Sequence, residues 1–337
     1  MKVIVDIEDN VEYMSFYLKG LEEIFSHGSM YYSRRAFDDL PQEARFSHSV
    51  RFILKDGLRE RRYAIDTTDP CTVNAALYDW CDVYGSVNAN RKRTPESLQS
   101  KLVALCPSFA IRHTDAIRAV AGVLHSMATT RGNRRKQLGR WKRVMQRPRI
   151  EDYALCQPRE GYVFHLSTLW QSDEWNRNDE GVNLRRAEFI RACRELGTAV
   201  TFEGGLVSTR NDKASQQFSD CLCRRYPANQ CLELTRQSAL VFNTPAYWDC
   251  HGWKLGEYMA LGKATLTTPL INDLPAPLEH GKHVHVVEHP TREALKEAIL
   301  QMMDNQAYRE QLGRNLHHYW QQYGTPQASL KLMGITR

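Results

Sequence analysis

The chain has 337 residues, 42% hydrophobic and 25% charged, which is the composition of a globular protein with about two domains. The formal charge is +6, but residues 131–149 alone hold nine basic and no acidic residues, so the basic excess is local and not spread over a nucleic-acid-binding face. The longest apolar runs are far shorter than the 18 or more residues that a membrane-spanning helix needs.

The cysteines and the first residues of the chain indicate the cellular compartment in which the protein is expected. Nine cysteines are scattered along the chain without matched close pairs, which favours reduced thiols over a disulfide framework or a zinc site. The opening MKVIVDIEDN turns acidic after a short apolar run, so it predicts a buried strand and not a signal peptide. We therefore expect a cytoplasmic protein.

The first half of the chain alternates strand-like and helical patterns. Val3 to Asp6 predicts a strand, and the apolar spacing from Met14 to Phe25 predicts a helix. Further strands are expected at 49–54, 63–65, 82–87 and 102–104, with helices at 73–80 and 114–126. Such alternation predicts a parallel sheet covered by helices.

After Pro148 the same pattern restarts. Strands are expected at 162–166, 199–202, 239–243, 264–267 and 283–287, and helices at 183–196, 213–224, 253–261, 292–303 and 308–323. We therefore expect an α/β protein with an amino-terminal domain over residues 1–150 and a second domain over residues 151–323. A last segment, 324–337, is expected to cross back to the first domain.

The most informative segment runs from Val241 to Val287. A strand ends at Asn243, a loop runs through Gly252, and a helix begins near Trp253. Such a loop lies outside the carboxyl end of a parallel strand, where open α/β sheets bind ligands. The helix amino terminus suits a phosphate group, and Lys254 adds a full positive charge there.

Two acidic residues flank this helix start. Glu257, one turn further along, is placed to accept hydrogen bonds from the paired hydroxyls of a sugar or ribose. Asp249, in the preceding loop, is placed to face the other end of the ligand. The alternative for each residue is structural, since Glu257 is equally suited to a local pair and Asp249 to a solvated loop.

Together these residues resemble the carboxyl-terminal domain of GT-B fold nucleotide-sugar glycosyltransferases. The E-x7-E family has an acidic loop residue, then E-A-M-A-x-G-K-P-V-I, then L-P-E-x-x-x-x-G and a D-x-x-x-L-x-x-A-I helix. Here the matching runs are Asp249, EYMALGKATL (257–266), LPAPLEHG (274–281) and LKEAI (295–299). The run HGWKLGEY (251–258) looks like bacterial surface-polysaccharide glycosyltransferases, of lipopolysaccharide or capsule.

The resemblance implies two Rossmann-like domains facing a cleft and a set of site residues. Glu257 would hold the ribose and Asp249 would lie near the donor sugar, although Asp249 replaces a longer Glu and His251 takes a usually aromatic place. The implied donor-binding residues are Lys254, Glu257, Arg185, Arg186, Gly204, Gly205 and Gly252. Arg185 and Arg186 would contact the diphosphate, or else form a solvated basic face. Gly204 and Gly205, expected after a strand, would approach the base or ribose, or else form an ordinary turn.

The expected chemistry needs no metal ion and no cofactor besides the nucleotide sugar as co-substrate. No D-x-D motif occurs, and that motif is the one the metal-dependent glycosyltransferase fold uses. Positive charge at the helix start would instead stabilise the leaving diphosphate. The candidate catalytic residues are Asp249, His251 and Asp9, the last as a general base just past the first strand.

We therefore expect a metal-independent glycosyltransferase that moves a sugar from a nucleotide-diphosphate sugar to a glycan or glycolipid hydroxyl. A nucleotide-sugar 2-epimerase of the same fold is the enzymatic alternative. A nucleic-acid-binding protein that uses residues 131–149 is the other alternative, although Trp141 is the only aromatic residue among the bases there, and we expect no nucleic-acid partner.

Residues 131–149 have a second interpretation. If Arg135 to Arg147 is helical, Leu138, Trp141, Val144 and Met145 share one side and six bases share the other. Either the apolar side packs on the first domain, or this helix lies on an anionic membrane and brings the site to a lipid-linked acceptor.

Overall fold

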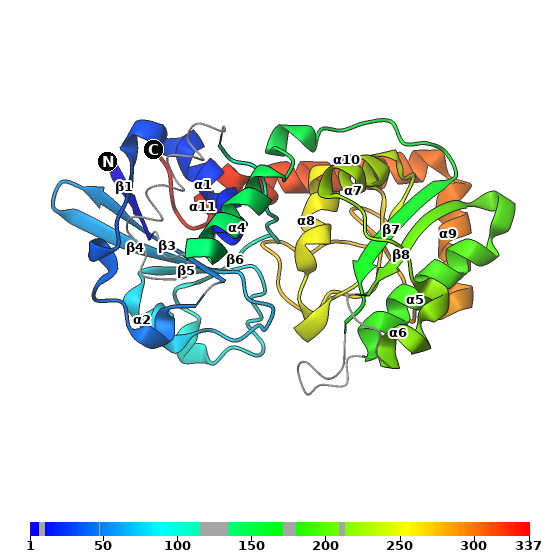
Figure 1. The fold of residues 1–337 in the computed structure, drawn as a ribbon, viewed down its shortest axis with the longest axis horizontal. Helices are drawn as coiled ribbons and strands as arrows, with labels where there is room; N and C mark the ends of the chain where they lie inside the picture. The colour runs from blue at the N-terminus through cyan, green and yellow to red at the C-terminus, as the bar shows by residue number, and fades with distance from the viewer. Residues whose placement is uncertain (7–10, 47, 115–133, 171–179, 209–212) are drawn as a thin grey trace. The chain divides into compact units, whose positions relative to one another are not determined.

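Figure 1 shows the computed structural model, which describes residues 1–6, 11–46, 48–114, 134–170, 180–208 and 213–337. The chain forms two compact units, each assembled from separate stretches of sequence. The first comprises Met1–Asp152, Asn272–Pro277 and Gln321–Arg337, and the second comprises Tyr153–Ile271 and Leu278–Trp320. In the described part of the chain, no helix is long and apolar enough to cross a membrane. None of the nine cysteines, all of which the structure describes, forms a disulfide.

The first unit is built on a six-stranded sheet of order β2-β1-β3-β4-β5-β6. Its strands are β1 (Lys2–Val5), β2 (Met30–Tyr32), β3 (Ser49–Asp56), β4 (Arg59–Asp66), β5 (Val83–Ser86) and β6 (Leu102–Ala104). The described helices of this unit are α1 (Val11–Phe25), α2 (Ala75–Trp80), α4 (Arg134–Met145) and α11 (Pro326–Leu332). The helix expected at 114–126 lies outside the described residues.

The expected all-parallel sheet is wrong for β3, which pairs antiparallel with both β1 and β4. Asp56 pairs with Arg59, so Gly57 and Leu58 form a two-residue turn between β3 and β4. Gly57 has a φ of 59°, a conformation that glycine adopts without steric cost. The other pairs of this sheet are parallel, so the sheet is mixed.

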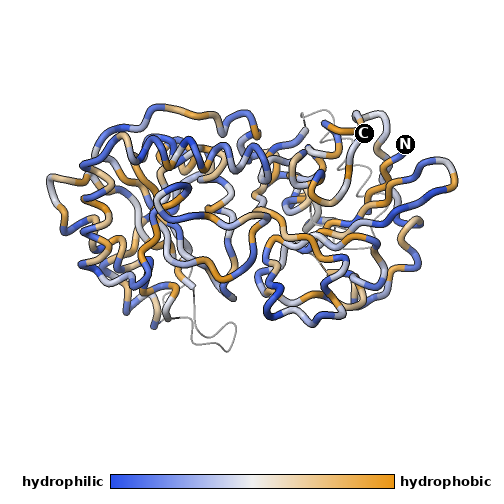
Figure 2. Tube along the Cα trace, turned by 180° about the vertical axis from the view of Figure 1, so that it is seen from behind, coloured by the Kyte–Doolittle hydropathy of each residue, from blue (hydrophilic) through white to orange (hydrophobic). Residues whose placement is uncertain are grey.

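The carboxyl-terminal helix α11 belongs to the first unit and packs against α1. A side chain at Gly20 would place its Cβ 2.5 Å from the carbonyl oxygen of Pro326, so glycine permits this close approach. Leu330, Met333 and Ile335 are buried in the same region. Figure 2 shows apolar residues along the strands inside each unit and polar residues along the outer helix faces.

The second unit contains two parallel sheets, β11-β10-β9 and β7-β8. Its strands are β7 (Tyr162–Thr168), β8 (Thr201–Val207), β9 (Val241–Asn243), β10 (Thr265–Thr267) and β11 (His285–Val286). Its described helices are α5 (Glu180–Glu195), α6 (Lys213–Gln217), α7 (Ala228–Gln237), α8 (Gly252–Ala260), α9 (Arg292–Met303) and α10 (Gln306–Tyr319). β7 lies next to β9, because Ala239 N–H donates to the carbonyl of Tyr162.

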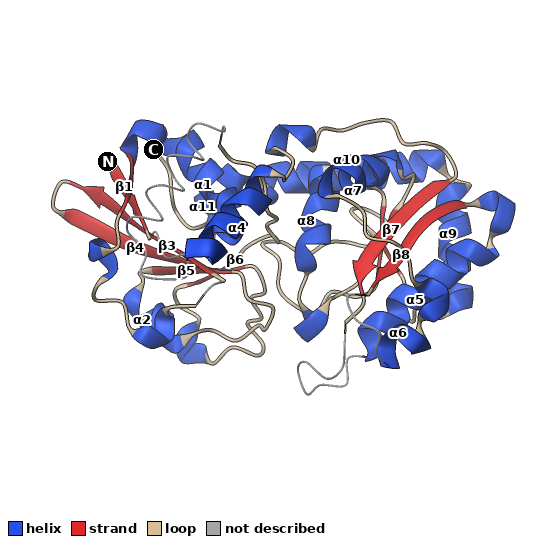
Figure 3. Cartoon of the chain, viewed as in Figure 1, coloured by secondary structure: helices blue, strands red, loops and turns tan. Residues whose placement is uncertain are grey.

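Helices cover these strands and form the core with them (Figure 3). Helix α5 packs against α9, whereas α8 packs against α10 and β9. Phe189 of α5 stacks on Phe242 of β9 with ring centroids 4.3 Å apart, within an apolar cluster that includes Leu266 and Ile299. This packing fixes the positions of the carboxyl ends of the strands relative to the start of α5 and of α9.

Two helices of the second unit differ from expectation. The helix expected at 213–224 ends at Gln217, because Leu222 instead pairs with Leu206 as a β-bridge. Helix α7 was not expected. It begins after Pro227, which occupies the N-cap position, and it packs on β7.

Candidate functional site

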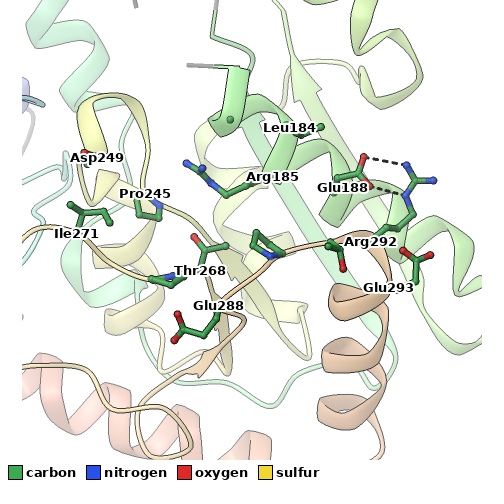
Figure 4. A pocket seen from close by; sticks show the side chains of 14 residues that line it. Leu184, Arg185, Glu188, Pro245, Asp249, Thr268, Ile271, Glu288, Arg292 and Glu293 are labelled. Carbon is green, nitrogen blue, oxygen red and sulfur yellow. Dashed lines mark hydrogen bonds and ion pairs between the residues drawn. The ribbon is translucent and has the colours of Figure 1, made fainter. Parts of the chain in front are cut away.

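The residues that follow β9, β10 and β11 meet at one edge of the sheet. The three strands run parallel, so their carboxyl ends lie together, which is where open α/β sheets bind ligands. A cavity of about 750 Å³ opens at this edge. Figure 4 shows its walls, which come from the loops after the three strands, the first half of α5 and the start of α9.

Prolines shape this edge. Pro245 follows β9, Pro269 follows β10 and Pro290 follows β11, and all three line the cavity. Proline lacks an N–H and cannot extend a sheet ladder, so each one helps to end its strand and turn the chain. Prolines that follow successive strands are therefore a sequence signal for this edge. The periodicity of helices and strands does not contain this signal.

One residue expected to bind the donor, Arg185, and one candidate catalytic residue, Asp249, line this cavity. Arg185 Nε donates to Thr244 Oγ1 at 2.9 Å, and that hydroxyl lies 2.8 Å from Thr268 Oγ1. In Figure 4 the Arg185 side chain leaves α5 and extends toward the loops after β9 and β10. The structure therefore brings these two distant residues to one cavity.

The opposite wall holds an ion pair that sequence reasoning missed. Arg292, at the start of α9, contacts Glu188 of α5 with Nε and Oε2 2.8 Å apart, and the pair is drawn in Figure 4. The hydrogen bond from Arg292 holds the pKa of Glu188 below its ordinary value. Because 104 residues separate them, no local pattern indicates this pair.

The loop between β9 and α8 has an unusual backbone. Trp248 and Asp249 have φ angles of 58° and 63°, in the left-handed region that residues other than glycine seldom adopt. Such conformations persist only where surrounding contacts enforce them, and they cluster at functional sites. Here they place Asp249 at the cavity.

At the start of α8, Lys254 and Glu257 contact each other. Lys254 Nζ lies 3.4 Å from Glu257 Oε2, and Tyr153 Oη donates to Glu257 Oε1 at 3.2 Å. Burial opposes the charge of Lys254, but the carboxylate of Glu257 outweighs it and raises the pKa of Lys254. The local pair left open by the sequence is thus present, and neither residue lines the cavity.

Arg186 is almost completely buried, with 8% of its surface exposed. Its Nη1 donates to the carbonyl of Thr168 at 3.0 Å, and among the described residues it has no other hydrogen bond and no ion pair. Burial lowers its pKa to about 10. Of the two alternatives for Arg186, the solvated basic face is therefore wrong.

His165, in β7, lies close enough to Arg186 for the charge of Arg186 to affect its pKa. Its pKa is lowered to about 3, first by burial and then by the charges of Arg186 and Lys254. Its Nε2 lies 2.7 Å from Ser167 Oγ, and Phe189 and Phe242 flank its ring. A neutral imidazole in the middle of β7 thus lies within the influence of two cations, a feature that the sequence did not indicate.

His251 and Gly252 begin α8. His251 occupies the N-cap position, is buried and does not line the cavity. Gly252 has a φ of 70°, and a Cβ there would meet only Ala246 at 3.8 Å. Glycine at 252 therefore serves the backbone turn into the helix.

Gly204 and Gly205 do not follow a strand as expected, because both lie inside β8. A Cβ at Gly204 would overlap the carbonyl of His165 in β7, and one at Gly205 would overlap the carbonyl of Cys221. Their φ angles of 108° and 151° also favour glycine. The two glycines allow backbone segments of the protein itself to approach each other.

The acidic residues after β1 divide into two groups. Asp9 lies outside the described residues. Asp6 is fully buried and pairs with Arg51, whose Nε lies 3.1 Å from Asp6 Oδ2. Asp6 therefore holds β1 to β3. Among the described residues, no group of three or more His, Cys, Asp and Glu side chains is arranged to hold a metal ion.

The family match lies in the second unit. Residues 225–318 match the family model described as Glycosyl transferases group 1. A search of curated proteins finds no significant match.

Several solved structures are similar at low identity. The carboxyl-terminal domain of a glycosyl transferase group 1 family protein, LpcC, from Francisella tularensis is 10% identical, with 51% of this chain and 95% of that domain covered and a TM-score of 0.37. A variant of S. aureus TarM in complex with UDP is 14% identical, with 86% and 65% covered and a TM-score of 0.37. A UDP-GlcNAc 2-epimerase from Neisseria meningitidis is 14% identical, with 77% and 62% covered and a TM-score of 0.42.

This chain covers less than two thirds of TarM and of the epimerase. The matched segment 225–318 contains β9, α8 and α9, and with them Asp249, Lys254 and Glu257. The second unit therefore contains a segment that matches the group 1 glycosyl transferases.

Proposed function

We propose that the protein transfers a glycosyl group from a nucleoside-diphosphate sugar to a hydroxyl of a glycan or lipid-linked acceptor, in bacterial surface-polysaccharide synthesis. The observation that carries the donor assignment is the buried Arg186, whose guanidinium has one carbonyl partner and no carboxylate among the residues that the structure describes. A diphosphate would supply the missing anionic partner, since guanidinium groups bind phosphate through paired hydrogen bonds.

Lys254 and the start of α8 would complete the diphosphate site. Both Arg186 and Lys254 act on the pKa of Tyr258, which burial raises first, so the two cations lie near the same phenol. Positive charge held in advance stabilises the charge that the leaving diphosphate gains in the transition state. We propose that these protein cations take the place of a metal ion.

Glu257 and the cavity would hold the sugars. The carboxylate of Glu257 is held by Lys254 and Tyr153, which orients it to accept hydrogen bonds from ribose hydroxyls. The cavity combines polar groups, Arg185 and Asp249, with the apolar side chains of Leu184 and Ile271. A sugar ring has hydroxyl edges and apolar faces, so such a lining suits the transferred sugar.

A thermal-shift panel of nucleoside diphosphates and nucleotide sugars tests the donor site. A ligand at 100 times its Kd adds about 2.7 kcal/mol to the free energy of unfolding, and we expect Glu257→Ala to abolish this gain in a folded protein. Glu279→Ala is a matched control, because Glu279 forms the same i,i+3 pair with Lys282 on the surface. Equal shifts in both variants would contradict the donor assignment.

Product analysis with and without acceptor tests the reaction. Transfer produces a new glycoside only when an acceptor hydroxyl is present. An epimerase instead converts the nucleotide sugar without an acceptor, so an epimerised donor in acceptor-free samples would replace the transferase assignment.

We also propose that α4 contacts the inner face of an anionic membrane. Val144 of α4 is buried and Arg143 pairs with Glu12 of α1, so part of the expected apolar side packs on the first unit. Arg135 and Lys142 are exposed, and Leu138 is 49% exposed. Each base near an anionic surface contributes about 1 kcal/mol, so this face suits the membrane of a lipid-linked acceptor.

Sedimentation with acidic and neutral liposomes at low and high salt tests the contact. We expect binding to acidic vesicles at low salt that falls in the variant with Arg135→Glu and Lys142→Glu. Arg314→Glu, on an exposed face of α10, should bind as the unmodified protein does. Equal binding to both vesicle types, or to neither, would remove the membrane role.

A further inference from the structure

Two buried threonine hydroxyls meet beside the cavity of the second unit. Thr244 follows β9 and Thr268 follows β10, and the two residues are 6% and 3% exposed. Their Oγ1 atoms lie 2.8 Å apart, and Arg185 Nε donates to Thr244 Oγ1 at 2.9 Å. Of the two threonines, Thr268 lines the cavity. The hydroxyl pair is therefore anchored by Arg185 and reaches the cavity through Thr268.

The hydrogen bonds of this pair leave one O–H donor unused. Each hydroxyl carries one proton and can also accept. The two hydroxyls share one hydrogen bond, and the bond from Arg185 uses only a lone pair of Thr244. Within the described residues, neither Oγ1 atom has a further hydrogen-bond partner. Buried polar groups are nearly always hydrogen-bonded. When Thr244 donates to Thr268, the proton of Thr268 remains for an acceptor inside the cavity.

Glu288 brings a hydrogen-bond acceptor to the neighbouring strand end. Thr267 of β10 pairs with Val286 of β11, and the N–H of Val287 donates to the carbonyl of Thr267 at 2.9 Å. Thr268 and Glu288 therefore follow adjacent parallel strands at their carboxyl ends. Both side chains line the cavity, and Figure 4 shows them at the ends of β10 and β11.

The carboxylate of Glu288 has no hydrogen bond and no ion pair with any residue that the structure describes. Two other carboxylates of the cavity are engaged. Glu188 pairs with Arg292, and Glu293 Oε1 lies 3.4 Å from Lys296 Nζ. Glu288 is exposed, so water satisfies it when the cavity is empty and a ligand can replace that water. The cavity thus offers one donor, Thr268, next to one charged acceptor, Glu288.

We propose that Thr268 and Glu288 together bind one hydroxyl group of the transferred sugar. Thr268 Oγ1 would donate to the hydroxyl oxygen, and the hydroxyl would donate its own proton to the Glu288 carboxylate. A hydroxyl both accepts and donates, whereas the ionised carboxylate of a uronic acid only accepts and would also meet the like charge of Glu288. The cavity therefore takes a sugar with a free hydroxyl at this position and rejects its deoxy and carboxylated counterparts.

The hydroxyl-binding pair follows from the cavity itself, and its assignment to the transferred sugar rests on the proposed function. Calorimetric titration with UDP-glucose, UDP-galactose, UDP-N-acetylglucosamine and GDP-mannose identifies the nucleotide sugar that binds most tightly. That compound is then compared with analogues in which one sugar hydroxyl at a time is replaced by hydrogen. We expect one analogue to bind about tenfold or more weakly, because it leaves Thr268 and Glu288 without their partner.

Glu288→Ala assigns this hydroxyl to Glu288. We expect the parent nucleotide sugar to bind about tenfold more weakly to this variant, and the deoxy analogue to lose little further affinity, because both changes remove the same interaction. Glu288→Gln should retain part of the affinity, since its amide oxygen still accepts a hydrogen bond. Thr268→Val removes the donor and should weaken the same nucleotide sugar.

Each substitution has a matched control. Glu293→Ala removes a carboxylate from the same cavity, but one that is paired with Lys296, so the affinity should not change. Thr265→Val removes a buried hydroxyl from β10 that donates to the carbonyl of Lys263, and it should also bind normally. Equal affinities of Glu288→Ala and Glu293→Ala for the nucleotide sugar would overturn the inference. Because Glu288 is exposed, this comparison is decisive even if Thr268→Val fails to fold.

Two further arms separate this inference from the donor assignment. UDP and GDP lack the sugar, so we expect them to bind Glu288→Ala as they bind the unmodified protein. Retained nucleotide binding together with equal nucleotide-sugar affinities in Glu288→Ala and Glu293→Ala would refute the hydroxyl site and keep the donor assignment.

If no nucleotide binds, free glucose, galactose and mannose are titrated against the methyl NMR signal of Ile271, which lines the cavity and is 43% exposed. The signal is assigned by its loss in Ile271→Val. A saturable shift that weakens in Glu288→Ala and not in Glu293→Ala would retain the hydroxyl site and refute the proposed function. No such shift would refute both.

Discussion

Arg186 and Arg140 are each nine-tenths buried without an ion pair in the described part of the chain. The sequence shows Arg186 only as one of two adjacent bases, and Arg140 only as one base among nine. What distinguishes them is burial, which depends on how α5 and α4 pack on neighbouring elements. The type of a charged residue can be read from the sequence, whereas its burial and its partners depend on distant parts of the chain.

Lys254→Ala tests the role of positive charge at the start of α8. We expect kcat to fall about tenfold to a hundredfold with a smaller change in KM, because the leaving diphosphate gains charge in the transition state. Steady-state kinetics measures both constants. Lys282→Ala, which breaks the equivalent exposed pair with Glu279, is the control. A rise in KM with an unchanged kcat would instead show that Lys254 stabilises the bound substrate and the transition state equally.

His165 predicts a pH dependence of stability. Its pKa is about 3 in the folded protein and about 6.5 when unfolded, so between these values the unfolded chain binds more protons. Stability is therefore complete above about pH 6.5 and falls as the pH drops, by about 2 kcal/mol at pH 5. Urea unfolding at pH 7 and pH 5 measures the loss.

His165→Asn removes the titrating group and should reduce this loss of stability. The comparison uses the difference between pH 7 and pH 5 within each protein, so a constant cost of the substitution does not matter. The same pH difference in both proteins would show that His165 is not the group responsible.

At the scale of elements, strands and helices with strong local patterns agree with expectation. The sequence predicts β6 and α9 at 102–104 and 292–303, which are the bounds observed. The antiparallel β3 was missed even though glycine at the first position of a two-residue loop, here Gly57, is typical of hairpins, because the alternation of the surrounding segments favoured a parallel sheet. Helix α7 was missed although its sequence is amphipathic, and in the structure it packs on β7.

Gly204→Ala tests the pairing of β7 with β8. The added Cβ would overlap the carbonyl of His165, and alanine disfavours a φ of 108°. We expect a loss of about 2–4 kcal/mol in the free energy of unfolding, measured by urea denaturation. Gly28→Ala, where a Cβ meets open space, should change stability little. Similar losses in both variants would contradict the close approach.

At the scale of the whole molecule, the first unit is completed by chain that follows the second. Residues Gln321–Arg337 belong to the first unit and place three apolar side chains, Leu330, Met333 and Ile335, in its interior. Burying a side chain of this kind contributes about 1.5–3 kcal/mol. The stability of the first unit therefore depends on its last segment.

A chain that ends at Trp320 tests this dependence. We expect the first unit to unfold at a clearly lower temperature by calorimetry and to be cut first by a protease, while the second unit keeps its transition. Removal of only the exposed Thr336 and Arg337 is the control. Identical transitions in the two shortened chains would show that α11 contributes little.

The need for a metal ion depends on the net charge of the whole donor site, which a bound metal ion would change. If Arg186 and Lys254 stabilise the diphosphate, activity should persist in excess EDTA, because the protein alone supplies the positive charge. Loss of activity that magnesium or manganese restores would contradict the proposal.

The sequence alone determined the order of most helices and strands, and it identified the segment from Asp249 to Glu257 as part of the candidate site. These features follow from local physics, because periodicity, turn residues and helix starts act over a few residues. The tertiary structure decided what each site residue does. It paired Glu257 with Tyr153, 104 residues away, and enclosed Gly204 within a strand. It also buried Arg186 and Arg140, because burial and charge pairing arise from contacts between distant parts of the chain.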